Sequence, residues 1–154
     1  MKLGSNSMLR LPEVRIVDKI PHGSHPVGRF TSTSSPQQIE FSRAECYKLL
    51  SREALLYVIY HELGHWFRTN CIRLEDIMGW SQDEGFLIFG NINSEEGFAD
   101  AFAAFLMGDP DFEARYPEQH ALLANMLNNF KEELRDFCDS TCKWLAKQLQ
   151  EETT

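Results

Sequence analysis

The sequence lacks the features of a nucleic-acid-binding or membrane-spanning protein. Its 154 residues include 15 basic and 23 acidic side chains, which give a formal net charge of -8. A protein that binds nucleic-acid phosphates needs clustered Lys and Arg, and no apolar run reaches the ~20 residues of a membrane span. The first residues also lack the apolar segment of a signal peptide. We therefore expect no nucleic-acid or membrane partner, and a location in the cytoplasm or outside the cell by a signal-independent route.

The cysteine spacing of a disulfide framework or a cysteine-based zinc site is lacking as well. The cysteines form neither a Cys-x-x-Cys pair nor a dense framework; they are Cys46, Cys71, Cys138 and Cys142. Such spacing favours reduced thiols over disulfides or a cysteine-based zinc site.

The length allows a single folded domain over residues 1–154. With 43% hydrophobic residues, a chain of this size can bury a core without disulfides or structural metals. A polar run precedes a second methionine, Met8, which is compatible with an added leader over residues 1–8. We leave these residues out of the predicted fold.

Short strands are predicted before the first long helix. Val27–Phe30 and Gln38–Phe41 have the character of brief strands near a stretch rich in Gly, Pro and Ser. Ser42 and Glu45 then have the spacing of a capping box, in which each side chain satisfies a free backbone N–H group of the first helical turn. We expect a helix to begin there and to continue to about Thr69.

A second helix is predicted to begin after Ser94, a good N-cap residue, and to end at the Gly108–Pro110 turn. Between the two helices, residues 70–93 are mixed in character. Leu74–Met78 is compatible with one helical turn, and Phe86–Phe89 with a short strand.

The C-terminal part of the chain has no Gly or Pro after Pro117. Side chains of one face recur there at alternating steps of four and three residues: Leu123, Leu127, Phe130, Leu134, Phe137, Thr141 and Trp144. This spacing is typical of an amphipathic helix. We expect its apolar face to pack on the same domain rather than to form a coiled-coil seam. The expected fold class is α+β, mostly helical, with a small sheet.

Two histidines in the first long helix have the spacing of a metal site. His61 and His65 are four residues apart, so a helix brings both imidazoles to one face. Imidazole nitrogens suit zinc well. Glu62 is rotated around the helix, which places it to contact a metal-bound water rather than the metal. The pattern predicts a zinc site with Glu62 as the general base.

A catalytic zinc site uses three protein ligands and a water, so one more ligand must come from elsewhere. No histidine follows within several residues, which excludes the three-histidine pattern. Glu96 and Asp100 share one face of the second helix, where Glu96 can bind the metal and Asp100 can accept the outer N–H of His61. Glu95 is the rival ligand, but its neighbour four residues on is Ala99, which cannot give that support. An acidic first turn that faces solvent is the alternative explanation of the pair.

Two stretches of the sequence, His61–His65 and Glu95–Phe102, resemble the motifs of the anthrax-lethal-factor-like zinc peptidases. This family of gluzincins includes bacterial toxins and proline-proline endopeptidases, and its second motif is similar to Glu-x-x-Ala-(Glu/Asp)-Ala-Phe. The resemblance covers about residues 25–125, but only the two helical motifs are specific.

The resemblance implies a zincin-like catalytic domain with an active-site helix and a glutamate-ligand helix. It implies that one Zn2+ ion is held by His61, His65 and Glu96 and that Glu62 is the general base. It also implies that Asp100 accepts a hydrogen bond from a liganding histidine. These roles agree with those inferred from spacing. The small sheet and a long C-terminal helix complete the expected domain, whose implied substrate is a peptide or protein.

One position departs from the family pattern. Family members are similar in having a tyrosine followed by glycine seven residues before the glutamate ligand, whereas this chain has Phe89 before Gly90. A phenyl ring cannot donate a hydrogen bond to an oxyanion, and loss of such a donor costs ~3–4 kcal/mol of transition-state stabilisation. Tyr116 and His120 are the candidate replacement donors.

The expected function is a zinc metalloendopeptidase in which Glu62 takes a proton from a metal-activated water and returns it to the leaving amine. We expect an extended substrate to pair with an edge of the sheet, with Gln38–Phe41 as the candidate strand. One alternative is a zinc-binding regulatory protein of weak or no activity, which Phe89 favours. The other is a zinc peptidase that cleaves a transcriptional repressor.

Overall fold

The structure, a computed structural model, describes residues 10–20, 27–33, 35–49, 51–71 and 95–152. The elements in these residues are β1 (Glu13–Val17), β2 (Gly28–Thr31), β3 (Gln38–Ser42), α1 (Arg43–Cys46), α2 (Arg52–Cys71), α4 (Glu95–Met107), α5 (Pro110–Arg115), α6 (Pro117–Leu127) and α7 (Lys131–Glu152). The expected α+β class, mostly helical with a small sheet, is confirmed. Three predicted features lie outside the described residues: the turn at Leu74–Met78, the strand at Phe86–Phe89 and the cap at Ser94.

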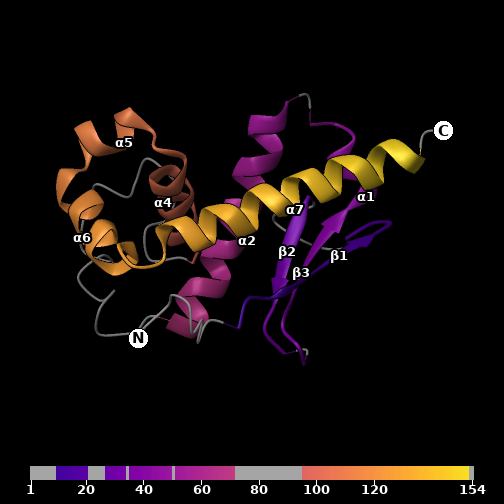
Figure 1. Ribbon diagram of the computed structural model, residues 1–154, viewed down its shortest axis with the longest axis horizontal. Helices are drawn as coiled ribbons and strands as arrows, with labels where there is room; N and C mark the ends of the chain where they lie inside the picture. Colours follow the sequence, from indigo (N-terminus) through magenta and orange to yellow (C-terminus); the bar gives the residue numbers. More distant parts are fainter. Residues whose placement is uncertain (1–9, 21–26, 34, 50, 72–94, 153–154) are drawn as a thin grey trace.

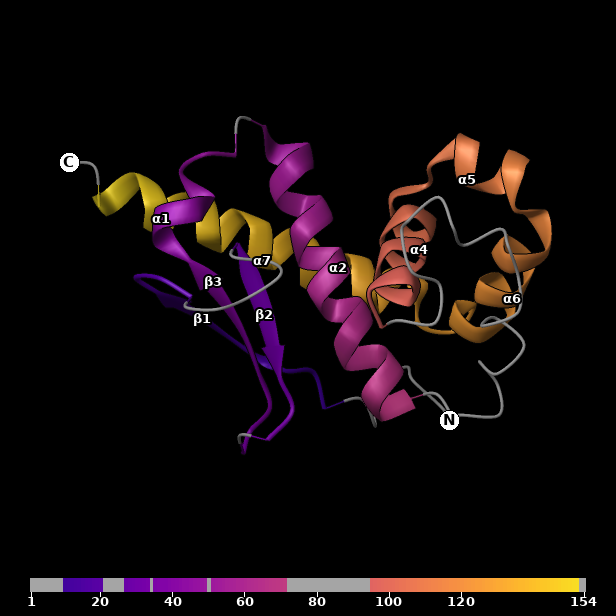
Figure 2. The same cartoon turned by 180° about the vertical axis from the view of Figure 1, so that it is seen from behind.

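Helix α2 lies at the centre of the molecule (Figure 1). The sheet lies on one side of α2, and α4, α5 and α6 lie on the other side. The view from behind shows the same order, with α7 crossing α2 and extending from the helical side to the sheet side (Figure 2). The contacts agree with this arrangement, since α2 packs against α4, α7 and β2.

The sheet has the strand order β1-β3-β2. β3 is the central strand, because it pairs in parallel with β1 and antiparallel with β2. The predictions for β2 and β3 are confirmed to within one residue at each end. β1 was not predicted, although the alternation of polar and apolar residues in Glu13–Val17 is a strand signal.

The predicted first long helix is in fact two helices. Ser42 caps α1 as expected, because its hydroxyl oxygen accepts a hydrogen bond from the backbone N–H of Glu45 at 3.3 Å. The chain leaves the helical conformation after α1 and re-enters it at α2. Ser51 supports this second start, since its hydroxyl oxygen accepts from the N–H of Ala54 at 3.1 Å. An uninterrupted helix from Ser42 to about Thr69 is therefore wrong, because a second N-cap residue opens a new helix.

Helix α4 ends at Gly108, as predicted. Gly108 has a φ of 72°, in the left-handed region that glycine adopts without steric cost. Arg135 of α7 donates to the carbonyl oxygen of Leu106 at 3.0 Å and so satisfies a carbonyl group at this helix end. The Asp109 side chain then accepts from the N–H of Asp111 at 3.0 Å, and the same turn begins α5, which was not predicted.

The predicted C-terminal helix is α6 followed by α7, with a break at residues 128–130. A long C-terminal helix is confirmed in α7. The buried positions of the predicted apolar face are Leu123, Leu127, Phe130, Leu134 and Thr141. The prediction is wrong at Trp144, which is 40% exposed while Leu145 is fully buried. A strict spacing of four and three drifts around a helix of 3.6 residues per turn, so its last member leaves the buried face.

The core lies where α2 meets α4, α7 and the sheet. Its largest fully buried side chains are Trp66, Phe41, Phe67, Phe102, Ile39, Ile59, Leu63, Leu106, Leu123, Leu127 and Leu134. Burial of each large apolar side chain contributes about 1.5–3 kcal/mol. All the cysteines are free thiols, as predicted. Among the described helices, none has the length and apolar character that crossing a membrane requires.

Helices α2 and α4 approach each other closely at Gly64. A Cβ atom added to Gly64 would lie 3.0 Å from the Cα atom of Ala99 and 3.2 Å from the Cβ atom of Phe102. Gly64 belongs to the His-Glu-x-x-His motif, and Ala99 belongs to the second motif. Small residues therefore set the separation of the two helices at the level of the motifs.

We expect Gly64→Ala to destabilise the protein by ~1–3 kcal/mol, because the new methyl group meets the backbone of α4. Without that contact the change would stabilise a helix by roughly 1 kcal/mol, since alanine has the higher helix propensity. The sign of the change in the free energy of unfolding therefore reports the close approach, and urea unfolding followed by circular dichroism measures it.

Ser140→Ala, on the exposed side of α7, is the control and should change stability by less than ~0.5 kcal/mol. A Gly64→Ala protein at least as stable as the wild type would show that the two helices can move apart without loss in the free energy of unfolding.

Candidate metal centre

The two sequence motifs face each other across the α2–α4 contact. His61 and His65 point from α2 towards Glu96 on α4. Glu62 is one residue further along and, at 3.6 residues per turn, points elsewhere, towards β2. The His61 side chain is 3% exposed, whereas that of Glu96 is 36% exposed. The site formed by the two histidines and Glu96 is therefore buried on the histidine side and open to solvent on the Glu96 side.

The ligating atoms of His61, His65 and Glu96 converge on one point, and we call these three residues the metal cluster. His61 Nε2 lies 2.9 Å from Glu96 Oε2 and 3.2 Å from His65 Nε2. His65 Nε2 lies 3.2 Å from Glu96 Oε1. One ligating atom from each residue lies within 4.8 Å of the other two. The metal cluster can therefore hold a metal ion.

Asp100 lies behind His61, where the sequence predicted it. Its Oδ1 atom is 2.8 Å from His61 Nδ1, the nitrogen that faces away from the metal cluster. A carboxylate can only accept, so Nδ1 carries a proton, and a metal ion would take the place of any proton on Nε2. The Tyr57 hydroxyl group donates to the same Oδ1 at 2.6 Å. Tyr57 was not inferred from the sequence, although it lies four residues before His61.

The charge around His61 favours a cation. Burial lowers the pKa of His61, because it disfavours the charged imidazolium, but the acidic neighbours outweigh burial. The hydrogen bond to Asp100 and the charges of Glu62, Asp100 and Glu96 raise the pKa of His61 above its ordinary value. The same negative charges that stabilise a proton on His61 would also stabilise a bound metal cation.

Glu62 is held by the sheet. It is 2% exposed, and the backbone N–H of Phe30 in β2 donates a hydrogen bond to its carboxylate. A Cβ atom on Gly28 would lie 3.2 Å from Glu62 Cγ, so the strand comes this close because Gly28 has no side chain. Burial is the main cause that raises the pKa of Glu62 to about 7, against the lowering effect of His61. The carboxyl group can therefore exchange a proton near neutral pH.

Tyr116 and His120, the candidate donors, pack against aromatic side chains of α4 and α5. The His120 ring lies 5.0 Å from that of Phe105 and 6.0 Å from that of Phe112. The Tyr116 ring lies 6.2 Å from that of Phe112. These ring contacts place both side chains beside α4 and α5, and their role as donors stays a prediction. Phe89 lies outside the described residues.

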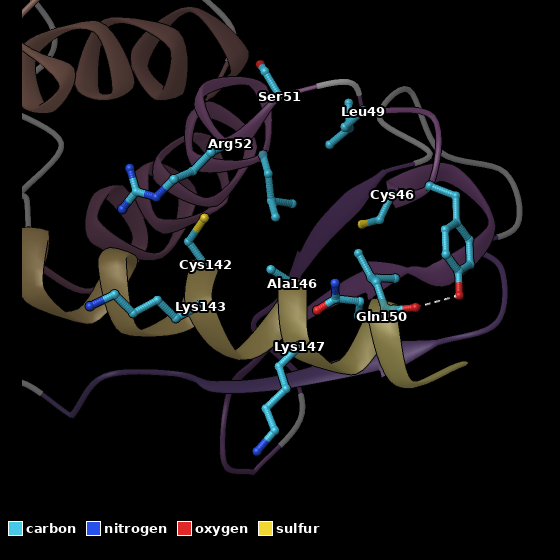
Figure 3. Close-up of a pocket in the computed structure, with 12 residues that line it drawn as sticks. Cys46, Leu49, Ser51, Arg52, Cys142, Lys143, Ala146, Lys147 and Gln150 are labelled. Atoms are coloured by element: carbon cyan, nitrogen blue, oxygen red, sulfur yellow. Dashed lines mark hydrogen bonds between the residues drawn. The ribbon is translucent and has the colours of Figure 1, made fainter. Parts of the chain in front are cut away.

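A cavity of about 730 Å³ lies apart from the metal cluster, between residues 46–55 and α7. Cys46 and Cys142 line opposite walls (Figure 3), and the Tyr47 hydroxyl group donates to the Leu149 carbonyl oxygen at 2.9 Å at one end. Burial raises the pKa of Cys46 to about 11 and also raises the pKa of Cys142, so neither thiol is a good nucleophile at neutral pH. No imidazole or carboxylate is found among the described residues of its lining. The cavity is therefore separate from the chemistry of the metal cluster.

Comparison of the chain with protein-family models, with curated proteins and with solved structures finds no match in any of the three. The family resemblance therefore rests on the two motifs alone.

We expect added zinc to raise the melting temperature of the wild-type protein and Glu96→Ala to remove that rise. A ligand that binds only the folded state stabilises it by about 2.7 kcal/mol at a concentration of 100 Kd. Differential scanning fluorimetry with zinc and with a chelator measures the shift.

Glu95→Ala is the matched control, because it removes the neighbouring carboxylate of the same helical turn and should retain the full shift. A melting temperature that responds neither to zinc nor to chelation would contradict the metal site. Loss of the shift in Glu95→Ala alone would identify Glu95 as the third ligand.

Proposed function

We propose that this chain is a zinc-dependent metalloendopeptidase, which hydrolyses peptide bonds. The observation that carries the proposal is the buried Glu62 carboxyl group, one residue from a histidine of a three-residue metal cluster. Catalytic zinc sites use three protein ligands and keep one position open, whereas structural sites use four. Among the described residues the metal cluster has three ligands, which is the number of a catalytic site.

The donor atoms and their spacing support zinc as the metal. Two imidazoles and one carboxylate are a ligand set of catalytic zinc sites, whereas calcium and magnesium prefer oxygen ligands alone. Two nitrogens bound at about 2.0–2.1 Å in a tetrahedral site lie ~3.3 Å apart. The Nε2 atoms of His61 and His65 are 3.2 Å apart, so the residues present fit the ion.

In the proposed mechanism, Glu62 transfers the proton and Asp100 orients a liganding histidine. A zinc ion at this site would supply Lewis acidity and lower the pKa of water towards ~7. Glu62, oriented by the N–H of Phe30, accepts the proton of the attacking water and returns it to the leaving amine. Asp100 holds His61 in the orientation that directs its Nε2 atom to the metal cluster.

The outer edge of β2 is the place where we propose that an extended substrate binds. The predicted strand, Gln38–Phe41, is wrong for this role because it belongs to β3, whose two edges are already paired. The Val27 carbonyl oxygen accepts from β3, so the alternation of an antiparallel ladder turns the backbone groups of Gly28 and Phe30 away from β3. The Phe30 N–H is already donated to Glu62, so a peptide added at this edge pairs with the other outward backbone groups and lies beside Glu62.

A zinc-binding protein without turnover is the second candidate, and Phe89 favours it. A phenyl ring in the place of a hydrogen-bonding tyrosine removes ~3–4 kcal/mol of oxyanion stabilisation. The Tyr57 hydroxyl group does not replace it, because its proton is already donated to Asp100. A repressor-cleaving peptidase has the same site chemistry and differs only in its substrate.

We expect Glu62→Gln to retain zinc and to lose hydrolysis by a factor of at least about 100, because glutamine keeps the shape of the side chain but cannot take a proton. Cleavage of a peptide library, followed by mass spectrometry, measures activity, and elemental analysis measures zinc.

Glu53→Gln, an exposed position of the same helix, is the control and should keep full activity. A fully active Glu62→Gln protein would exclude Glu62 as the base. A wild-type protein that holds zinc and cleaves no library member would favour the second candidate.

A further inference from the structure

We propose that Tyr57 is a positioning residue of the metal centre, whose hydroxyl group fixes Asp100 so that Asp100 holds His61 in its ligating orientation. The proposal rests on the metal-binding part of the proposed function. It adds to the site a residue that lies outside both sequence motifs.

Tyr57 lies on the same face of α2 as both histidines, at successive steps of four residues. Its hydroxyl oxygen is 2.6 Å from Asp100 Oδ1, and His61 Nδ1 is 2.8 Å from that same oxygen atom. The rings of Tyr57 and His61 have centroids 6.2 Å apart. One carboxylate oxygen of α4 thus receives hydrogen bonds from two successive turns of α2.

The second hydrogen bond limits how the Asp100 carboxylate can rotate. The terminal torsion of an aspartate side chain is broad, so a single bond to His61 leaves the carboxylate free to swing about it. Tyr57 approaches the oxygen from the preceding turn of α2 and fixes the plane of the carboxylate. Solvent competes little, because the Asp100 side chain is 18% exposed and that of His61 is 3% exposed.

Tyr57 remains a donor at physiological pH. Burial, and then the hydrogen bond to Asp100, raise the pKa of Tyr57 above its ordinary value. Its proton is therefore present and is used by Asp100. A hydroxyl group committed in this way acts through Asp100 rather than on the substrate.

Tyr57→Phe tests the proposal, because it removes one oxygen atom and keeps the aromatic ring. We expect zinc affinity to fall about tenfold, at the lower end of the effect of losing an outer partner of a liganding histidine. We also expect the melting temperature of the zinc-free protein to change no more than in the control. Competition with a zinc chelator measures the Kd.

Tyr60→Phe is the matched control, since it removes the same atom from the same helix. Tyr60 is 3% exposed, and its charged or polar neighbours include Cys138, Asp139 and Arg135 of α7 rather than residues of α4. We expect this variant to bind zinc as the wild type does.

The same comparison in an Asp100→Ala background tests whether Tyr57 acts through Asp100. Residues of one hydrogen-bond network have non-additive effects. We therefore expect Tyr57→Phe to cause no further loss of zinc affinity once Asp100 is alanine.

Three results with the variants would overturn the proposal. These are an unchanged zinc Kd in Tyr57→Phe, an equal loss in Tyr60→Phe, and a loss in Tyr57→Phe that persists in full in the Asp100→Ala background. A wild-type protein that binds no zinc would overturn both the metal centre and the role of Tyr57. A wild-type protein that binds zinc but cleaves no peptide would remove the peptidase function, and the affinities would still decide the role of Tyr57.

Discussion

The close contact between α2 and α4 is the constraint on which the site depends. Metal–ligand bonds are about 2.0–2.2 Å long, so ligands from two helices can share an ion only if the helix backbones are held at a fixed separation. Gly64 and Ala99 allow that separation because neither brings a large side chain to the contact. The sheet and α7 pack on other faces of α2, which keeps the helix that carries both histidines from turning away.

Signals within a few residues of one another predicted much of the fold. Ser42 marked the start of α1, Gly108 marked the end of α4, and two of the three described strands were found from composition. One error came from a local cap that was overlooked, and the other arose where tertiary packing decides. Ser51 opens a new helix in a stretch that reads as continuous, and the face of α7 that meets the core buries Leu145 instead of Trp144.

The metal cluster was predictable because residues four apart in the sequence project from the same face of a helix. The four-residue steps from His61 to His65 and from Glu96 to Asp100 each define one face, and the contact between Asp100 and His61 follows if the faces meet. The groups around Glu62 were not predictable. The backbone N–H of Phe30 comes from a different segment of the chain, and no local pattern states which strand will pass beside which helix.

The backbone of β2 contacts the Glu62 carboxyl group, whereas α4 supplies Glu96 to the metal cluster, and α2 carries both Glu62 and the two histidines. Ion capture and acid–base chemistry are thus separately adjustable properties of this architecture. For the proposed peptidase, a change confined to β2 would silence turnover while the ion stays in place. A descendant of such a proposed peptidase could pass from enzyme to ion-carrying scaffold without any alteration of its ligands.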